Sequence, residues 1–229
     1  MRASPLVTLG ALLIGVAILA MANSACAQNL LRNGDFAEGH GNEAADWHTI
    51  SWVDLPDTKF IWIAPAGGEP GLVSISDPIA NDTAWVQSLH LHRGWYYAGA
   101  QAKAVCGEKG KDSVLYGALI SLADVGVVSP DLVPSHDWQD LGFYFRVGPD
   151  GADVELQLRL VCPSDYRVGQ AFFRSASVVK VDAPPAHARL FDLDQVRTRY
   201  GGMRWTMVVL AIFLSLGAAA GWSMLPRSI

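Results

Sequence analysis

The middle of the chain is a series of short apolar runs separated by Gly, Pro, Asp and Asn, between Asn29 and about Asp182. Two of these runs alternate strictly between apolar and polar residues. One carries its apolar positions at Leu141, Phe143, Phe145 and Val147, and the other at Val154, Leu156, Leu158 and Leu160. Because successive side chains of a strand point to opposite faces, this alternation predicts strands with one buried face and one exposed face.

Eight segments fit this pattern well enough to be predicted as strands. They are Lys59–Ile63, Leu72–Ser76, Ala84–Leu91, Trp95–Val105, Val114–Leu122, Asp137–Val147, Val154–Val161 and Ala171–Val181. No long segment with helical periodicity lies among them, and turn-forming residues separate them at short intervals. The pattern therefore predicts an all-β domain, a sandwich or barrel, over residues 28–182.

Residues 1–27 have the features of a secretory signal peptide. Arg2 supplies the positive end, Leu6–Ala22 the apolar segment, and Ala25-Cys26-Ala27 a small-residue cleavage site. An uncleaved anchor helix is the alternative interpretation.

The segment Trp205–Leu225 contains no charged residue and is long enough, at about 30 Å as a helix, to span a bilayer. We expect one C-terminal transmembrane helix with residues 226–229 as a cytoplasmic tail, and the domain on the extracytoplasmic side, periplasmic or extracellular. More arginines precede the helix than follow it, which by itself favours the reverse orientation, but a signal peptide translocates a long domain largely regardless of charge.

Residues 183–204 connect the two predicted units. Pro184 and Pro185 make a stiff break, and the spacing of Leu190, Leu193, Val196 and Tyr200 predicts a short juxtamembrane helix. Inside the membrane segment, Gly217 and Gly221 form a G-x-x-x-G motif, which lets two helices approach closely and predicts a contact with a partner helix.

Composition narrows the possible ligands. The chain of 229 residues is 51% hydrophobic and has a formal net charge of −5, and the acidic balance argues against nucleic acid as a partner. No catalytic or nucleotide-binding motif occurs, so we predict no enzymatic activity and no cofactor. His90 and His92 share a strand face, but without a third ligand at a recognisable spacing we predict no metal site there.

The stretch Asn29–Trp47, with Leu30, Leu31 and Phe36 in a predicted first strand, resembles the opening of carbohydrate-binding modules of the family 4/9/22 type, which are galactose-binding-like jelly rolls. Two later stretches resemble the same family, one from Trp85 to Tyr97 and one from Gly169 to Val181. The resemblance implies a jelly-roll β-sandwich and a glycan or polysaccharide ligand. It also implies a structural calcium, for which Asp35 and Glu38 are in place, whereas Arg174 stands where the family commonly has Asp.

Recognition of a sugar needs flat aromatic rings and polar groups that bind hydroxyls. Residues of these types with outward parity, brought together by the strand order that the resemblance implies, are predicted to bind carbohydrate: Tyr97, Gln101, Trp138, Tyr144, Glu155, Gln157 and Arg159. A plain solvated sheet is the alternative for these residues. Trp47, Trp52, Trp62 and Trp85 are interpreted as core or rim.

Cys106 and Cys162 each end a predicted strand of an exported domain, which favours a disulfide over two free thiols. The sequence thus predicts a non-catalytic, membrane-anchored glycan-binding module of a polysaccharide-handling system. The alternative function is a structural or scaffold subunit of a membrane protein complex, with partners in the lipid bilayer and no sugar ligand.

Overall fold

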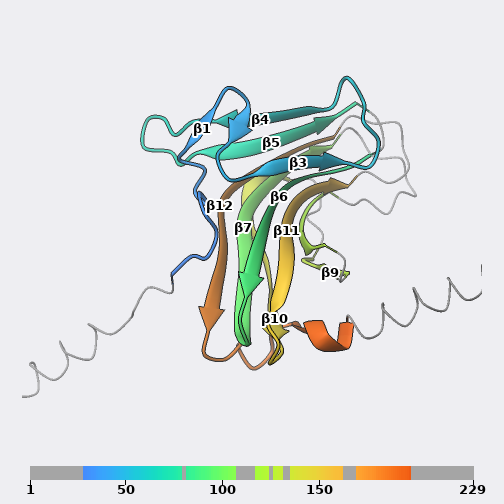
Figure 1. Ribbon diagram of the computed structural model, residues 1–229. Coiled ribbons are helices and arrows are strands. Elements are labelled where there is room, and N and C mark those ends of the chain that lie inside the picture. Colours follow the sequence, from blue (N-terminus) through green and yellow to red (C-terminus); the bar gives the residue numbers. More distant parts are fainter. Residues whose placement is uncertain are drawn as a thin grey trace, which may run out of the picture.

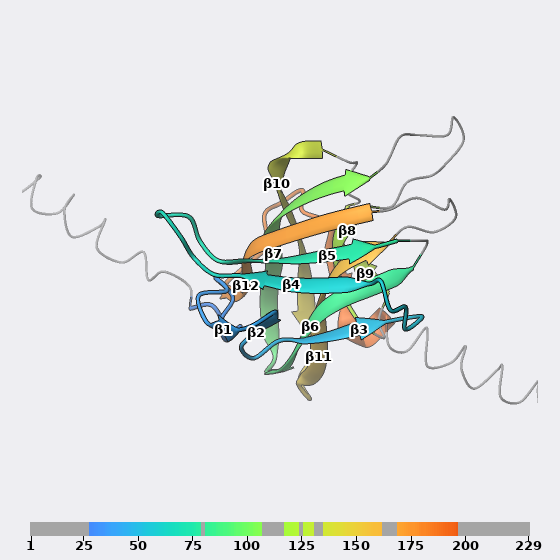
Figure 2. The ribbon, with the colours of Figure 1, turned by 90° about the horizontal axis from the view of Figure 1, so that it is seen from above.

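The computed structural model describes residues 28–78, 81–106, 117–123, 126–130, 135–161 and 169–196. These residues form two β-sheets packed against each other, and Figures 1 and 2 show the two layers from the side and from above. The prediction of an all-β sandwich is confirmed.

One sheet has six strands and contains the longest strands of the chain. Its spatial order is β13 (Leu190–Asp192), β10 (Ser135–Val147), β7 (Gly94–Cys106), β12 (Gly169–Val181), β5 (Leu72–Asp77) and β4 (Lys59–Ile63). All neighbours are antiparallel except β13, which runs parallel to β10.

The other sheet has five strands, all antiparallel to their neighbours. Its spatial order is β3 (His48–Ser51), β6 (Asp82–Leu91), β11 (Ala152–Val161), β8 (Ala118–Leu122) and β9 (Val127–Val128). A small hairpin of β1 (Gly39–His40) and β2 (Glu43–Ala44) lies next to β4.

The core lies between the two sheets and is built by the predicted alternation. The inward residues of β10 and β11 are buried, as the sequence predicts: Leu141, Phe143, Phe145, Val147, Val154, Leu156, Leu158 and Leu160. The inward face of β7 consists of Tyr96 and four alanines, Ala98, Ala100, Ala102 and Ala104, all buried. Small residues on this central strand leave room for the large side chains of its neighbours, as close packing requires.

The first predicted strand is wrong. Residues 32–35 form a turn, and among Leu30, Leu31 and Phe36 only Leu30 is exposed, whereas the other two are buried. The physical reason is a set of asparagine side chains that bond the backbone locally. The Asn29 side chain accepts from the amide of Leu31 (3.1 Å), and the Asn33 amide group donates to the carbonyls of Glu38 and Ala45 (2.8 Å each).

The predicted juxtamembrane helix is wrong over its first turn. Residues Leu190–Asp192 form strand β13, which pairs with Tyr144–Arg146 of β10, and helix occupies only 193–196 of the described residues. The edge of β10 offers backbone hydrogen bonds, and the ring of Phe191 packs edge-on against Phe143 at 5.8 Å. Leu193 is fully buried, so this segment is part of the domain.

Several predictions fall on residues that the structure does not describe: the leader over 1–27, Cys162, the helix Trp205–Leu225 and its Gly217 and Gly221. Among the residues that are described, no helix has the length and hydropathy needed to span a membrane.

Candidate functional site

The seven residues predicted to bind carbohydrate are divided between the two sheets. Four of them, Tyr97, Gln101, Trp138 and Tyr144, lie on β7 and β10 of the six-stranded sheet, and the other three, Glu155, Gln157 and Arg159, lie on β11 of the five-stranded sheet. Their neighbours of opposite parity form the core between the sheets, so the two groups face outward on opposite sides of the sandwich. They do not line one groove.

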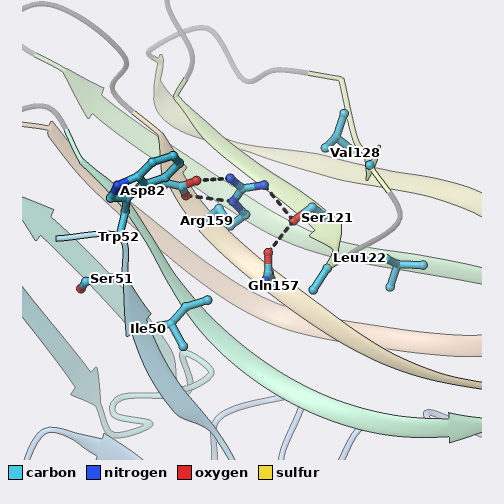
Figure 3. A pocket seen from close by; sticks show the side chains of 11 residues that line it. Ile50, Ser51, Trp52, Asp82, Ser121, Leu122, Val128, Gln157 and Arg159 are labelled. Atoms are coloured by element: carbon cyan, nitrogen blue, oxygen red, sulfur yellow. Dashed lines mark hydrogen bonds and ion pairs between the residues drawn. The ribbon is translucent and has the colours of Figure 1, made fainter. Parts of the chain in front are cut away.

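The outer face of the five-stranded sheet contains an open groove of about 320 Å³ (Figure 3). Its walls come from the end of β3 with Trp52, and from β8 and β9 with Leu122 and Val128. Asp82, Gln157, Arg159 and Ser121 lie between them. We call this surface the groove.

A continuous chain of polar side chains crosses the groove. Arg159 binds Asp82 through both ends of its fork, with Nε donating to Oδ1 at 3.0 Å and Nη2 to Oδ2. Arg159 Nη1 donates to the Ser121 hydroxyl at 3.4 Å, and this hydroxyl donates to Gln157 Oε1 at 3.1 Å.

This series of hydrogen bonds fixes the orientation of the groups that a ligand would meet. Strand register explains why these side chains lie together, because Arg159 pairs with Ala84 and Leu119, and Gln157 pairs with Val86 and Ser121. The Gln157 amide accepts from Ser121 through its oxygen and donates to no other described residue, so its NH₂ group is the donor of this side chain that a ligand could use, although Gln157 keeps only 8% of its surface exposed.

Trp52 is the most exposed large apolar side chain among the described residues, with 82% of its surface accessible. It immediately follows β3, and its backbone amide donates to the carbonyl of Asp82 at 2.8 Å. Val53 is then held by Asn81, whose side chain bonds both the amide (3.2 Å) and the carbonyl (3.0 Å) of that residue. The backbone of the tryptophan is thus fixed at the groove, although its indole ring is in solvent.

The outer face of the six-stranded sheet, which we call the Tyr97 face, has a different character. The ring of Tyr97 lies across Gly99 and Gly142, where an added Cβ would clash with it, and it contacts the ring of Tyr144 with centroids 4.9 Å apart. A smaller depression of about 240 Å³ lies beside it. Burial, followed by the neighbouring Tyr144 and Asp140, raises the pKa of Tyr97.

The other polar and aromatic groups of the Tyr97 face are engaged with one another. The guanidinium of Arg174 lies 4.2 Å from the centre of the Trp138 ring, donates to Gln101 Oε1 at 2.8 Å and pairs with Glu69 at 3.1 Å. Gln101 in turn donates to Asp140 at 3.2 Å. The aromatic face of Trp138 is therefore covered by an arginine of its own chain.

Neither the histidines nor the acids gather into a metal site in the described part of the chain. The ring of His90 bonds the Asp153 carboxylate at 2.7 Å and lies 5.3 Å from the ring of His92, at the far end of the five-stranded sheet. Glu155 lies on the same outer face, exposed, between this end and the groove. Asp35 and Glu38 lie in the N-terminal loop, where Asp35 accepts from the amide of Ala37 at 3.3 Å.

Three residues of the groove were not predicted from the sequence as site residues: Trp52, Asp82 and Ser121. Trp52 was predicted to be core or rim, but its segment, Ser51-Trp-Val-Asp-Leu-Pro-Asp57, has the polar and proline content of an exposed loop. That context was the available signal. The sequence gives no signal that Asp82 and Ser121 lie beside Arg159, because only the strand order β6-β11-β8 brings these residues together.

Comparisons with known proteins identify no family, because no family model and no curated protein matches the chain. Solved structures with a similar arrangement include the tailspike protein 4 enzymatically active domain of bacteriophage CBA120 (TM-score 0.47, 10% identity, 67% of this chain and 21% of that chain). A carbohydrate-binding module described as TmCBM61, in complex with β-1,4-galactotriose, has a TM-score of 0.44 and 14% identity over 67% of this chain and 99% of that one. A structure titled "CBM4 structure and function" has a TM-score of 0.39 and 18% identity, with 66% and 99% coverage.

Several of these structural neighbours are carbohydrate-binding modules, and others are enzyme chains. Because these TM-scores are below 0.5, the function of this protein has to be inferred from the geometry of its own residues.

Proposed function

We propose that this protein is a non-catalytic glycan-binding module that holds a saccharide in the groove of its five-stranded sheet. The observation that carries the proposal is the exposed Trp52 ring beside the ordered Asp82–Arg159–Ser121–Gln157 chain. An indole presents a broad apolar face, which matches the C–H face of a pyranose, and the ordered polar groups match its hydroxyls.

The groove has the physical properties of a preorganised binding surface. Its volume of about 320 Å³ is at the lower end of the range for small-molecule sites. Arg159 and Gln157 are held by protein partners before any ligand arrives, so little side-chain freedom is lost on binding. The side chain of Ile50, which is 41% exposed, contributes to the non-polar part of the lining.

The chemistry of the groove favours binding over catalysis. The Asp82 carboxylate is occupied by two hydrogen bonds from Arg159, one to each oxygen. The Ser121 hydroxyl donates to the Gln157 carbonyl oxygen, which is not a base that could activate it as a nucleophile.

Hydrogen exchange of the full-length protein would test both the ligand class and the face. The purified protein in detergent would be screened on a glycan array, and its exchange measured with and without the best ligand. We expect protection of the backbone near Ser51–Trp52 and Gln157–Arg159, and none near Tyr97–Gln101. Protection confined to the Tyr97 face would place the site on the other sheet, and an array without binding would contradict the proposal.

We further propose that this module is anchored in a membrane, with its domain on the extracytoplasmic side and Cys106 joined to Cys162. The support is the apolar leader before residue 28 and the uncharged segment Trp205–Leu225. Protease added to intact spheroplasts should digest the domain, and mass mapping without reduction should join the two cysteine peptides. A protected domain, or two thiols that react with alkylating agents in the exported protein, would contradict these points.

A scaffold subunit without a sugar ligand is the second candidate, and the Gly217/Gly221 pair favours it. Replacing both glycines by Ile should weaken cross-linking to a partner helix in membranes while insertion stays normal. Unchanged association would leave the segment as a simple anchor.

A further inference from the structure

The charges around the groove bear on which glycans it would accept. Among the described residues that line it, only Asp82 and Arg159 are charged, and they neutralise each other in a bidentate pair. Both side chains keep only about a quarter of their surface exposed, 28% for Asp82 and 23% for Arg159. The pair as a whole carries no net charge, so it attracts a carboxylate or sulfate on a ligand far less than an unpaired guanidinium would.

The surrounding charges on the same outer face add to this effect. Glu155 precedes Gln157 by two positions on the outer side of β11, and Asp153, two positions before Glu155, is bonded to His90. The other outward residue of β3 beside the groove is His48, which pairs with Val86 of β6. Among the described residues of this face, an anionic glycan would therefore meet more acidic than basic side chains.

We propose that the groove selects uncharged glycans over acidic ones, and that Asp82 is the residue responsible because it cancels the charge of Arg159. This inference rests on the proposed glycan-binding function and specifies its ligand class. Asp82 is then a specificity-determining residue: it holds the arginine in place as a hydrogen-bonding group and removes it as an anion receptor.

The opposite sheet offers a matched control. Arg174 is likewise paired with an acid, Glu69, at 3.1 Å, but that pair lies on the Tyr97 face. Glu69→Gln and Asp82→Asn change the net charge of the protein by the same amount and by the same chemistry. They differ in which arginine they release, so a difference between them measures the groove and not the overall charge.

The test is affinity electrophoresis of the full-length protein in two matched pairs of polysaccharides and in neutral galactan, xylan and β-glucan. The pairs are hydroxyethyl- and carboxymethyl-cellulose, and methyl-esterified and de-esterified homogalacturonan. We expect the parent protein to be retarded by neutral polymers and not by their acidic partners. Asp82→Asn should shift the ratio of affinities toward the acidic polymer by about fivefold or more at low salt, an effect that 0.5 M salt should suppress. Glu69→Gln should keep the ratio of the parent.

The possible results distinguish a failure of the inferred selectivity for uncharged glycans from a failure of the proposed glycan binding. Retardation of the parent by acidic polymers as strong as by neutral ones would overturn the inference and leave glycan binding standing. The inference would also be overturned if Asp82→Asn gave the same ratio of affinities as Glu69→Gln. The variant Asp82→Glu keeps the charge and shows whether a substitution at this position merely disturbs the fold. Retardation by none of the polymers, neutral or acidic, would instead contradict the proposed function.

Discussion

The two outer faces of the sandwich carry nearly the same set of side chains in opposite states. The groove has Trp52, Arg159 and Gln157, with Asp82 as the acid. The Tyr97 face has Trp138, Arg174 and Gln101, with acids at Glu69 and Asp140. On the Tyr97 face the arginine stacks on the tryptophan at 4.2 Å, whereas in the groove the arginine is held by the acid and the tryptophan remains 82% exposed.

The difference lies in which partner satisfies the arginine. A guanidinium stacked on an indole occupies the surface that a sugar ring would need. A guanidinium clamped by a carboxylate leaves the indole available and still presents ordered N–H groups. Residue types and outward parity are common to both faces, so the pairing decides which face is ready to bind.

Substitution of the two tryptophans should have the largest effect and should differ most between the two faces. Trp52→Ala should weaken binding of a neutral oligosaccharide by more than about tenfold, since it removes the stacking surface, and should leave the unfolding free energy within about 0.5 kcal/mol of the parent. Trp138→Ala should leave affinity unchanged, because Arg174 already covers that ring. Titration calorimetry and thermal unfolding of both variants measure these effects. The opposite pattern, with loss of binding only in Trp138→Ala, would move the site to the Tyr97 face.

The two arginines should contribute differently to the free energy of unfolding. Arg159→Gln leaves the Asp82 carboxylate without its bidentate partner and should cost about 1–2 kcal/mol, less than a fully buried pair because both side chains retain some exposure. Arg174→Gln should cost about 0.5–1 kcal/mol, mainly through the lost contact with Trp138, since its ion-pair partner Glu69 is 77% exposed. Denaturant unfolding followed by fluorescence would measure both, and equal costs would mean that the two pairings are equivalent.

Much of the fold could be predicted from the sequence because the alternation in β10 and β11 reports burial directly. Val154, Leu156, Leu158 and Leu160 are inward as predicted, and the strand boundaries are within a few residues. The errors fall where local bonding competes with periodicity. Hydrogen bonds from the side chains of Asn29 and Asn33 stabilise a bend and turn over residues 31–35, where the alternation of apolar residues predicts a strand. Leu190–Asp192, which have helical spacing in the sequence, instead pair as a strand with the edge of β10.

The candidate site was only partly predictable, because it depends on strand order. Gln157 and Arg159 were identified from their outward parity, but parity cannot show that β11 lies beside β6 and β8, which supply Asp82 and Ser121. Parity also cannot show that Tyr97 and Trp138 lie on the opposite side of the core from them. The pairing of Arg174 with Trp138 spans two strands of one sheet that are not direct neighbours, so the covering of that ring has no sequence signature.

The glutamines test a smaller effect on each face. Gln157→Met keeps the approximate volume, removes the NH₂ donor and should weaken glycan binding by about threefold to tenfold, the value of one hydrogen bond. Gln101→Met on the Tyr97 face should leave affinity unchanged, because that amide bonds Arg174 and Asp140 within the protein. Calorimetry with the same oligosaccharide compares them directly. Equal losses in the two variants would indicate a general effect of the substitution and not a contact with the ligand.

The smallest expected effect is a change in the pH dependence of stability at alkaline pH, and it concerns the Tyr97 face alone. The pKa of Tyr97 is raised above its ordinary value of 10.0, chiefly by burial and then by the neighbouring Tyr144 and Asp140. Below pH 10 the phenol is neutral in the folded and unfolded chains, so its contribution to stability is fully present. As the pH rises past 10, the unfolded chain loses this proton before the folded one does, and stability falls until the pH passes the folded pKa.

Tyr97→Phe removes that proton, so its Tm should fall less steeply than that of the parent between pH 9 and 11. The difference should be on the order of 1 °C, because Tyr97 is only half-buried and solvent screens its charge. Tyr96, whose pKa burial also raises, stays in both proteins and contributes equally to each curve. No tyrosine is among the described residues that line the groove, so the affinity for a neutral oligosaccharide should be the same in Tyr97→Phe and the parent at each pH. An affinity that changed with Tyr97→Phe would show that the two faces are coupled through the core, and they would then have to be treated as one site.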